Sequence, residues 1–231
     1  RLLDGARGRD DLASLRLVAH AGSPCPAPLK ERAIATLPEG AVWEFYGSTE
    51  GQFTVCSPDD WQARPTSVGR ARAGRELSVN DDGTIWCRPP SFARWRYWRD
   101  DERTALAWRD GAFTVGDLGR LDPEGYLFLD GRRDDLIITG GVNVYPLEVE
   151  RAVLAHPGVV DAVVFPIDDA HWGQMVCAAV VGAVDEDGLR RFVEPTLAPY
   201  KRPKRWVVVE ALPHTPTGKL RRSDMAELLG L

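Results

Sequence analysis

The sequence has few of the features that mark secreted, membrane or zinc-binding proteins. Its four cysteines, Cys25, Cys56, Cys87 and Cys177, are widely spaced and form no C-x-x-C pair, and its four histidines lack zinc-ligand spacing. No run approaches the roughly 20 apolar residues that a transmembrane helix needs, and no charged-then-apolar signal peptide opens the chain. We therefore expect reduced, mostly buried thiols, no transmembrane segment and a cytoplasmic protein.

An excess of positive charge is also absent. The 29 basic and 34 acidic side chains leave a net charge of −5, so we expect no nucleic-acid partner, which usually requires a strongly basic face. With 44% hydrophobic and 27% charged residues, the composition is that of an ordinary globular protein. The 231 residues suffice for two small domains. Because the chain begins Arg1-Leu2-Leu3 without a methionine, we expect a fragment of a longer protein.

The first part of the chain alternates between strand and helix patterns. An apolar run at 15–19 predicts a buried strand, and helical spacing of apolar residues predicts a helix over 28–37. A second predicted strand, 41–46, leads into Gly47-Ser48-Thr49-Glu50-Gly51. Hydroxyls and backbone N–H groups at the carboxyl end of a strand are typical of ligand sites in α/β folds, although an ordinary β-turn fits the same residues.

The middle of the chain is rich in short strands. The patterns at 76–79 and 84–87, with turn residues between them, predict a small β-barrel or meander. An aromatic cluster follows, which either lines a pocket or wedges under a loop: Trp95, Tyr97, Trp98 and Trp108. Asp117 is expected to close a short strand at a glycine corner, before two hairpin strands at 118–121 and 126–129.

Residues 131–150, GRRDDLIITGGVNVYPLEVE, have the composition of a hinge followed by a glycine turn and a helix start. Gly140 and Gly141 permit positive φ and close backbone approach. Pro146 suits the first helical turn, and Glu148 and Glu150 suit the positive end of the helix dipole. Alone, the stretch fits a plain junction between two domains equally well.

A small α+β domain is predicted after this junction. Helices are expected over 147–155 and 189–197, and strands over 159–166, 175–184 and 205–209. Basic residues concentrate between 201 and 222, where Glu210 is the only acid. Such a concentration indicates phosphate binding or a solvated basic face.

Four segments, which occur in the same order as in the family, give the chain a resemblance to the adenylate-forming enzymes. This family includes acyl-CoA synthetases, nonribosomal peptide adenylation domains and luciferases. EFYGSTEG at 44–51 resembles the family's aromatic-G-x-T-E signature, and FTVGDLG at 113–119 its T-G-D signature. The 131–150 segment resembles its hinge, and LPHTPTGKLRR at 212–222 its P-x4-G-K signature. AHAGSPCPAPLKERA at 19–33 is similar to the segment that contacts adenine.

The resemblance implies a nucleotide site. Tyr46 would stack on adenine, Thr49 would hold a phosphate, and Glu50 would coordinate Mg²⁺. Asp117 and Arg132 would bind the ribose. The full set of implied nucleotide contacts is Gly22, Ser23, Glu44, Phe45, Tyr46, Gly47, Asp117 and Arg132.

The resemblance also implies roles after the junction. Asp134 would be the pivot about which the C-terminal domain turns between two half-reactions. Gly140 and Gly141 would line the tunnel for the pantetheine arm of coenzyme A. Lys219 would reach the acyl carboxylate and the α-phosphate, so that Lys219, Thr49 and Glu50 form the implied catalytic set.

The implied fold is α/β and α+β. Residues 1–133 would be the end of a large AMP-binding domain with its small β-barrel, and 134–231 a mobile α+β domain that carries Lys219. The implied activity is an ATP-dependent acyl-CoA ligase for a fatty or aryl carboxylic acid, with ATP or AMP, Mg²⁺ and coenzyme A as ligands. A carrier-protein-loading adenylation domain and a non-catalytic module that binds nucleotide or coenzyme A are the alternatives.

The chain departs from the family pattern in three respects. Val115 replaces the threonine of T-G-D, and the stretch between 69 and 90 is short. The Ser/Thr/Gly-rich phosphate loop that family members carry upstream is absent, and no G-x-x-x-x-G-K-[ST] replaces it. We therefore predict that these residues need the N-terminal part of the same enzyme as a partner and are inactive alone.

Overall fold

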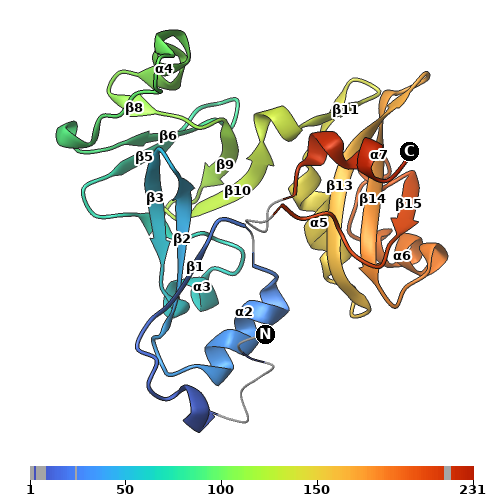
Figure 1. Ribbon diagram of the computed structural model, residues 1–231, viewed down its shortest axis with the longest axis horizontal. Coiled ribbons are helices and arrows are strands. Elements are labelled where there is room, and N and C mark those ends of the chain that lie inside the picture. The colour runs from blue at the N-terminus through green and yellow to red at the C-terminus, as the bar shows by residue number, and fades with distance from the viewer. Residues whose placement is uncertain (1–2, 4–8, 24, 216–219) are drawn as a thin grey trace. The chain divides into compact units, whose positions relative to one another are not determined.

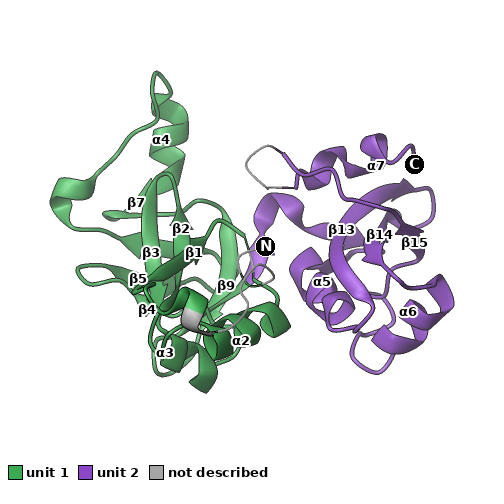
Figure 2. Ribbon diagram, turned by 60° about the horizontal axis from the view of Figure 1, so that its bottom comes forward, with its two compact units in different colours: residues 1–129 green, residues 130–231 purple. Residues whose placement is uncertain are grey.

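The computed structural model describes residue 3 and residues 9–23, 25–215 and 220–231. The chain forms two compact units, residues 1–129 and 130–231, which Figure 2 colours separately. A functional pivot at Asp134, with domains 1–133 and 134–231, stays a prediction. In the described ranges, no helix has the length and apolar character needed to cross a membrane.

The first unit begins with a four-stranded sheet in the order β1-β2-β3-β4 (Figure 1). Its strands are β1 (Val18–Ala21), β2 (Val42–Ser48), β3 (Gly51–Cys56) and β4 (Arg70–Ala71). Strand β1 is parallel to β2, and the other neighbours are antiparallel. The helices of this part are η1 (Arg9–Leu12), α2 (Ala27–Thr36) and α3 (Pro58–Ala63).

The expected strand at 15–19 was wrong in position and burial. The observed β1 begins at Val18, and Leu17 is exposed. Successive side chains of a strand point to opposite faces of its sheet, so partly buried and exposed side chains alternate along β1. By contrast, α3 begins where local chemistry dictates: Ser57 accepts the Asp60 N–H while Asp60 accepts the Ser57 N–H, with Pro58 at the first turn.

The β-rich remainder of the first unit forms two small open sheets. One has the order β5-β6-β8-β7, and the other pairs β10 with β9. The bounds are β5 (Glu76–Val79), β6 (Ile85–Arg88), β7 (Trp108–Arg109), β8 (Ala112–Phe113), β9 (Asp117–Leu121) and β10 (Leu127–Arg132), with η2 (Ser91–Ala93) and α4 (Asp101–Ala107). A bridge between Thr84 and Leu118 links them. Asp117 begins β9 rather than closing the preceding strand, because β8 already ends at Phe113.

The second unit is built on a five-stranded sheet (Figure 1). Its order is β12-β11-β14-β13, and β15 pairs in parallel with β14. The strands are β11 (Ile137–Thr139), β12 (Val142–Val144), β13 (Val159–Asp169), β14 (Gly173–Gly182) and β15 (Arg205–Val208). The helices are η3 (Arg133–Asp135), α5 (Pro146–Leu154), α6 (Glu186–Val193), η4 (Arg222–Asp224) and α7 (Met225–Leu228).

Strands β13 and β14 are buried on both faces. Val164 and Ala178 belong to a core with residues of α5 and α6, whereas Phe165 and Ala179 belong to a separate core with Met225 of α7. This explains why these strands are almost continuously apolar, the pattern expected of strands covered on both sides. Each fully buried Val or Phe contributes about 1.5–3 kcal/mol, so these two cores account for much of the stability of the unit.

Candidate functional site

The turn between β2 and β3 carries the Gly-Ser-Thr-Glu-Gly segment. Gly47 is required here, because a Cβ at this position would lie 2.5 Å from the Gly51 carbonyl oxygen. This close approach folds β3 back on β2, with Ser48 paired to Gly51. Thr49 is left exposed, and Glu50 is partly buried. The turn therefore presents a hydroxyl and a carboxylate side by side at the carboxyl end of β2.

Tyr46 and Asp117 meet, although they are 71 positions apart. The Tyr46 hydroxyl donates a 2.7 Å hydrogen bond to Asp117 Oδ2, and both residues are buried. Asp117 follows Gly116, whose φ of +81° turns the chain into β9. The structure thus brings an aromatic ring and a carboxylate from two of the predicted site segments into one place.

Glu50 is held in its charged form. Tyr97 donates a 2.7 Å hydrogen bond to Glu50 Oε1. Burial alone would raise the pKa of this carboxyl, but the Ser48 hydroxyl, the Tyr97 hydroxyl and the Arg103 guanidinium lower the pKa below its ordinary value. Sequence analysis missed Tyr97 as a partner of Glu50, since the two residues are separated by 47 positions. An ionised carboxylate with hard oxygen atoms is a suitable ligand for Mg²⁺, which is commonly bound by one or two carboxylates together with substrate phosphates.

The remaining predicted nucleotide contacts of the first unit differ in their exposure and in their interactions. Gly22, at φ +92°, and Ser23 are exposed directly after β1. Phe45 is partly buried. Glu44 instead forms a buried ion pair with Lys30 of α2, whose ammonium group lies 5.2 Å from the centre of the Trp61 ring. The Glu44 side chain therefore ties α2 to the sheet, so a nucleotide contact from this residue would have to come from its backbone.

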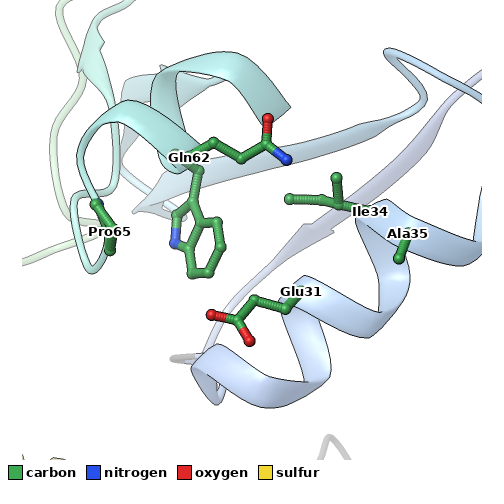
Figure 3. A pocket seen from close by; sticks show the side chains of 6 residues that line it. Glu31, Ile34, Ala35, Gln62 and Pro65 are labelled. Atoms are coloured by element: carbon green, nitrogen blue, oxygen red, sulfur yellow. The ribbon is translucent and has the colours of Figure 1, made fainter.

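A shallow hollow of about 470 Å³ lies between α2 and α3. Figure 3 shows Glu31, Ile34 and Ala35 of α2 on one side and Gln62 and Pro65 on the other. The residues that line it include none of the predicted site residues. The hollow is therefore distinct from the β2–β3 turn.

From Arg132 to Gly141, the predicted residues have exposed side chains or lie on an exposed turn. Arg132 ends β10, and Asp134 lies in η3; both are exposed. Gly140 and Gly141 form the β11–β12 turn with φ of +57° and +78°, as their glycine identity predicts. A Cβ on Gly140 would come within 2.9 Å of the Trp172 ring. Lys219 lies outside the described residues, so its predicted role stays a prediction.

The sequence did not predict an ion-pair network in the second unit, which joins the partly buried Arg222 and Asp135 to the buried Glu150. Arg222 donates from Nη2 to both carboxylate oxygens of Glu150, at 2.7 and 2.6 Å, and from Nη1 to Asp135 at 2.9 Å. Burial opposes a charged guanidinium, but these two carboxylates raise the pKa of Arg222 above its ordinary value.

This pairing changes the interpretation of the basic stretch at 201–222. Lys201 pairs with Glu148, Arg202 with Glu194, and Arg222 with Glu150 and Asp135. Much of the positive charge is therefore neutralised by acids that lie elsewhere in the sequence. The Arg222 guanidinium is used inside the fold, so Arg222 does not belong to a solvated basic face.

Comparison with known proteins identifies the family. The AMP-binding enzyme model matches residues 1–91, and the model of the AMP-binding enzyme C-terminal domain matches residues 148–219. The chain belongs to the AMP-binding, adenylate-forming enzymes. This membership confirms the resemblance found in the sequence and the mixed α/β and α+β fold.

Individual relatives agree with this assignment. The chain is 36% identical over 231 residues to a 2-succinylbenzoate-CoA ligase of Bacillus mycoides, covering 94% of the chain and 47% of the relative. An o-succinylbenzoate coenzyme A synthetase of Bacillus subtilis, solved with ATP and magnesium ion, superimposes with a TM-score of 0.83 at 31% identity, over 97% of this chain and 48% of that one. An amide bond synthetase of Marinactinospora thermotolerans gives a TM-score of 0.83 at 33% identity, with 92% and 47% covered. The chain thus spans about half the length of the relatives it matches.

Proposed function

We propose that the chain is part of an ATP-dependent acyl-CoA ligase of the AMP-forming type. The meeting of Tyr46 and Asp117 at 2.7 Å, beside the turn that carries Thr49 and Glu50, supports this proposal most directly. It joins two segments that are characteristic of the family at a point where a buried ring and carboxylate can receive a nucleoside.

The reaction would proceed in two steps. In the first, a carboxylate oxygen of the acid attacks the α-phosphorus of ATP, and the bond to pyrophosphate breaks to give an acyl adenylate. In the second, the sulfur of coenzyme A attacks the acyl carbon and loses its proton, and AMP leaves. Rotation of one domain between the two steps would exchange the catalytic surface without moving the intermediate.

Each residue of the first unit has a physical task in this scheme. The two oxygens of the Asp117 carboxylate suit the paired hydroxyls of a ribose, and the Tyr46 ring suits an adenine face. The Thr49 hydroxyl can donate to a phosphate oxygen. Glu50 would hold Mg²⁺, which when bound offsets the negative charge of the phosphates.

The residues of the second unit complete the proposal. Lys219 would act as a mobile cation at the α-phosphate, a role that suits a point charge on a flexible side chain. Asp134 would be the pivot, Arg132 a further ribose contact, and Gly140 and Gly141 the lining of the pantetheine tunnel. Arg132, Asp134, Gly140 and Gly141 are exposed, which supports the assignments of these four residues, since ligand-binding residues commonly lie on exposed segments.

The substrate proposal follows from the relatives. A 2-succinylbenzoate-CoA ligase is 36% identical, so an aryl carboxylic acid is the first class to test, with fatty acids second. A cytoplasmic location and dependence on the N-terminal part of the same enzyme are proposed with it. Carrier-protein loading and non-catalytic ligand binding remain the alternatives.

The test uses the full-length protein that contains this chain. It is incubated with ATP, Mg²⁺, coenzyme A and a panel of aryl and fatty acids, and the products are separated by mass spectrometry. We expect AMP, pyrophosphate and one acyl-CoA in equal amounts. Formation of ADP, or acylation of a carrier protein but not of coenzyme A, would contradict the proposal.

A further inference from the structure

Several aromatic residues of the first unit form a connected cluster that supports the predicted metal-binding turn. The Trp95 ring contacts Trp108 at 5.4 Å, Phe113 at 5.3 Å and Tyr97 at 4.9 Å between ring centres. Phe113 is fully buried and contacts Phe53 of β3 at 5.2 Å. The cluster is therefore anchored in the core of the unit, and Tyr97 lies at its outer end.

Tyr97 is fixed on several sides. Trp95 meets its ring edge-on, and the Arg103 guanidinium of α4 lies 4.1 Å from the ring centre. Its backbone N–H donates a 2.9 Å hydrogen bond to the Thr104 hydroxyl, which in turn donates to the Asp100 carbonyl oxygen at the start of α4. A ring held in this way has little freedom, so its hydroxyl occupies a defined position.

That position is at Glu50. The Tyr97 hydroxyl donates to Glu50 Oε1 at 2.7 Å. The same cluster contacts the next residue of the turn, because a Cβ added to Gly51 would lie 3.1 Å from the Phe113 ring. The turn is thus supported both at its carboxylate and at its backbone by side chains that come from beyond residue 90.

We propose that Tyr97 is a positioning residue, whose phenol orients the Glu50 carboxylate to receive the Mg²⁺ of Mg·ATP. This inference rests on the proposed function of Glu50. A hydrogen bond to one oxygen fixes the plane of the carboxylate and directs the other oxygen toward a cation. Removing a residue of this kind, which contacts a metal-binding side chain rather than the metal itself, typically lowers metal affinity by about 10–100-fold.

The structure supplies a matched control. Tyr126 donates a 2.6 Å hydrogen bond from its hydroxyl to Asp60, so it makes the same kind of bond in the same unit but to a different carboxylate. Tyr97→Phe and Tyr126→Phe each remove one hydroxyl and keep the ring. Glu50→Gln tests the assumed ligand itself. Thermal melts of the full-length variants check that each one is folded.

The measurement is the affinity of full-length protein for α,β-methylene-ATP by calorimetry, once with Mg²⁺ and once with EDTA. We expect Tyr97→Phe to lose about tenfold in affinity with Mg²⁺ and nothing with EDTA, which a merely structural effect would not reproduce. Tyr126→Phe should match wild type in both conditions. In steady-state assays, Tyr97→Phe should need more Mg²⁺ for half-maximal rate and keep its kcat at saturating Mg²⁺.

Each other outcome has a defined meaning. If Glu50→Gln loses the Mg²⁺-dependent affinity and Tyr97→Phe keeps it, the inference about Tyr97 is wrong and the role of Glu50 stands. Equal losses for Tyr97→Phe with and without Mg²⁺, or equal losses in the two tyrosine variants, would likewise overturn it. If Glu50→Gln itself keeps the full Mg²⁺ effect, the assignment of Glu50 fails, and the inference about Tyr97 fails with it.

Discussion

Replacing Arg222 with methionine should destabilise the second unit strongly, because it leaves a buried carboxylate without its main partner. The Glu150 side chain is only 8% exposed, and both of its oxygens accept from Arg222. Removing one member of a buried ion pair costs roughly 3–5 kcal/mol, since the remaining charge stays desolvated. Domains of this size have a free energy of unfolding of about 5–15 kcal/mol, so the loss would be a large share of the total.

The matched control is Lys201→Met. Lys201 also pairs with a glutamate of α5, Glu148, at 2.7 Å, but the Glu148 side chain is 43% exposed. A solvent-screened pair contributes about 1 kcal/mol or less. The double variant Arg222→Met/Glu150→Leu should recover much of the loss, because it removes the unpaired carboxylate as well.

The effect should depend on pH in a defined direction. Burial raises the pKa of the Glu150 carboxyl, and the Arg222 guanidinium opposes this rise. Without Arg222, the folded-state pKa lies above the unfolded value of about 4.3. Proton binding by Glu150 then stabilises the folded state of the variant. This stabilisation is fully present below the unfolded-state pKa and is lost as the pH rises through the folded-state pKa. The deficit of Arg222→Met relative to wild type should therefore shrink as the pH is lowered.

Hydrogen exchange of the β13 and β14 amides measures the stability of this unit alone. The account predicts that protection of these amides falls by roughly 3–5 kcal/mol in Arg222→Met at neutral pH and by about 1 kcal/mol or less in Lys201→Met. Equal and small losses of amide protection in the two variants would refute the reasoning. So would a stability deficit of Arg222→Met, relative to wild type, that grows as the pH is lowered.

Three further predictions concern the proposed reaction, and the first two are measured on the two half-reactions separately. In the full-length enzyme, Lys219→Ala should slow acyl-adenylate formation by about 10²–10³-fold and leave thioester formation from supplied acyl adenylate within a few-fold of wild type; parallel losses in both steps would exclude this role. Asp134→Pro fixes φ near −65° and should impair one half-reaction far more than the other, whereas equal losses would argue against a pivot. Residues 1–231 alone should adenylate no acid in a pyrophosphate-release assay, and turnover at an ordinary enzymatic rate would show that prediction to be wrong.

The sequence predicts the parts of this fold that depend on local pattern. Pro146 correctly marks the start of α5, and the apolar runs of β13 and β14 predict strands because both of their faces are buried. The positive φ of Gly140 and Gly141 follows from residue type. The position of β1 could not be predicted, since an edge strand in an apolar run has no local signal for where it begins.

Contacts between distant residues account for what the sequence did not predict. Glu150 and Arg222 are 72 positions apart, and Glu50 and Tyr97 are 47 apart, so no periodicity connects them. Charge counting placed Arg222 in a basic stretch that indicated either phosphate binding or a solvated face, although partial burial and pairing decide its role. Tyr97 was found as part of an aromatic cluster, but only the three-dimensional arrangement shows that its hydroxyl reaches a carboxylate.

The most direct test of the central claim is the exchange of labelled pyrophosphate into ATP by full-length protein, in the presence of its acid and Mg²⁺. Adenylation of a carboxylate predicts exchange that requires the acid, does not require coenzyme A and falls by about 10²-fold or more in Glu50→Gln. Exchange that proceeds without any acid, or that is unchanged in Glu50→Gln at limiting Mg²⁺, would contradict the account.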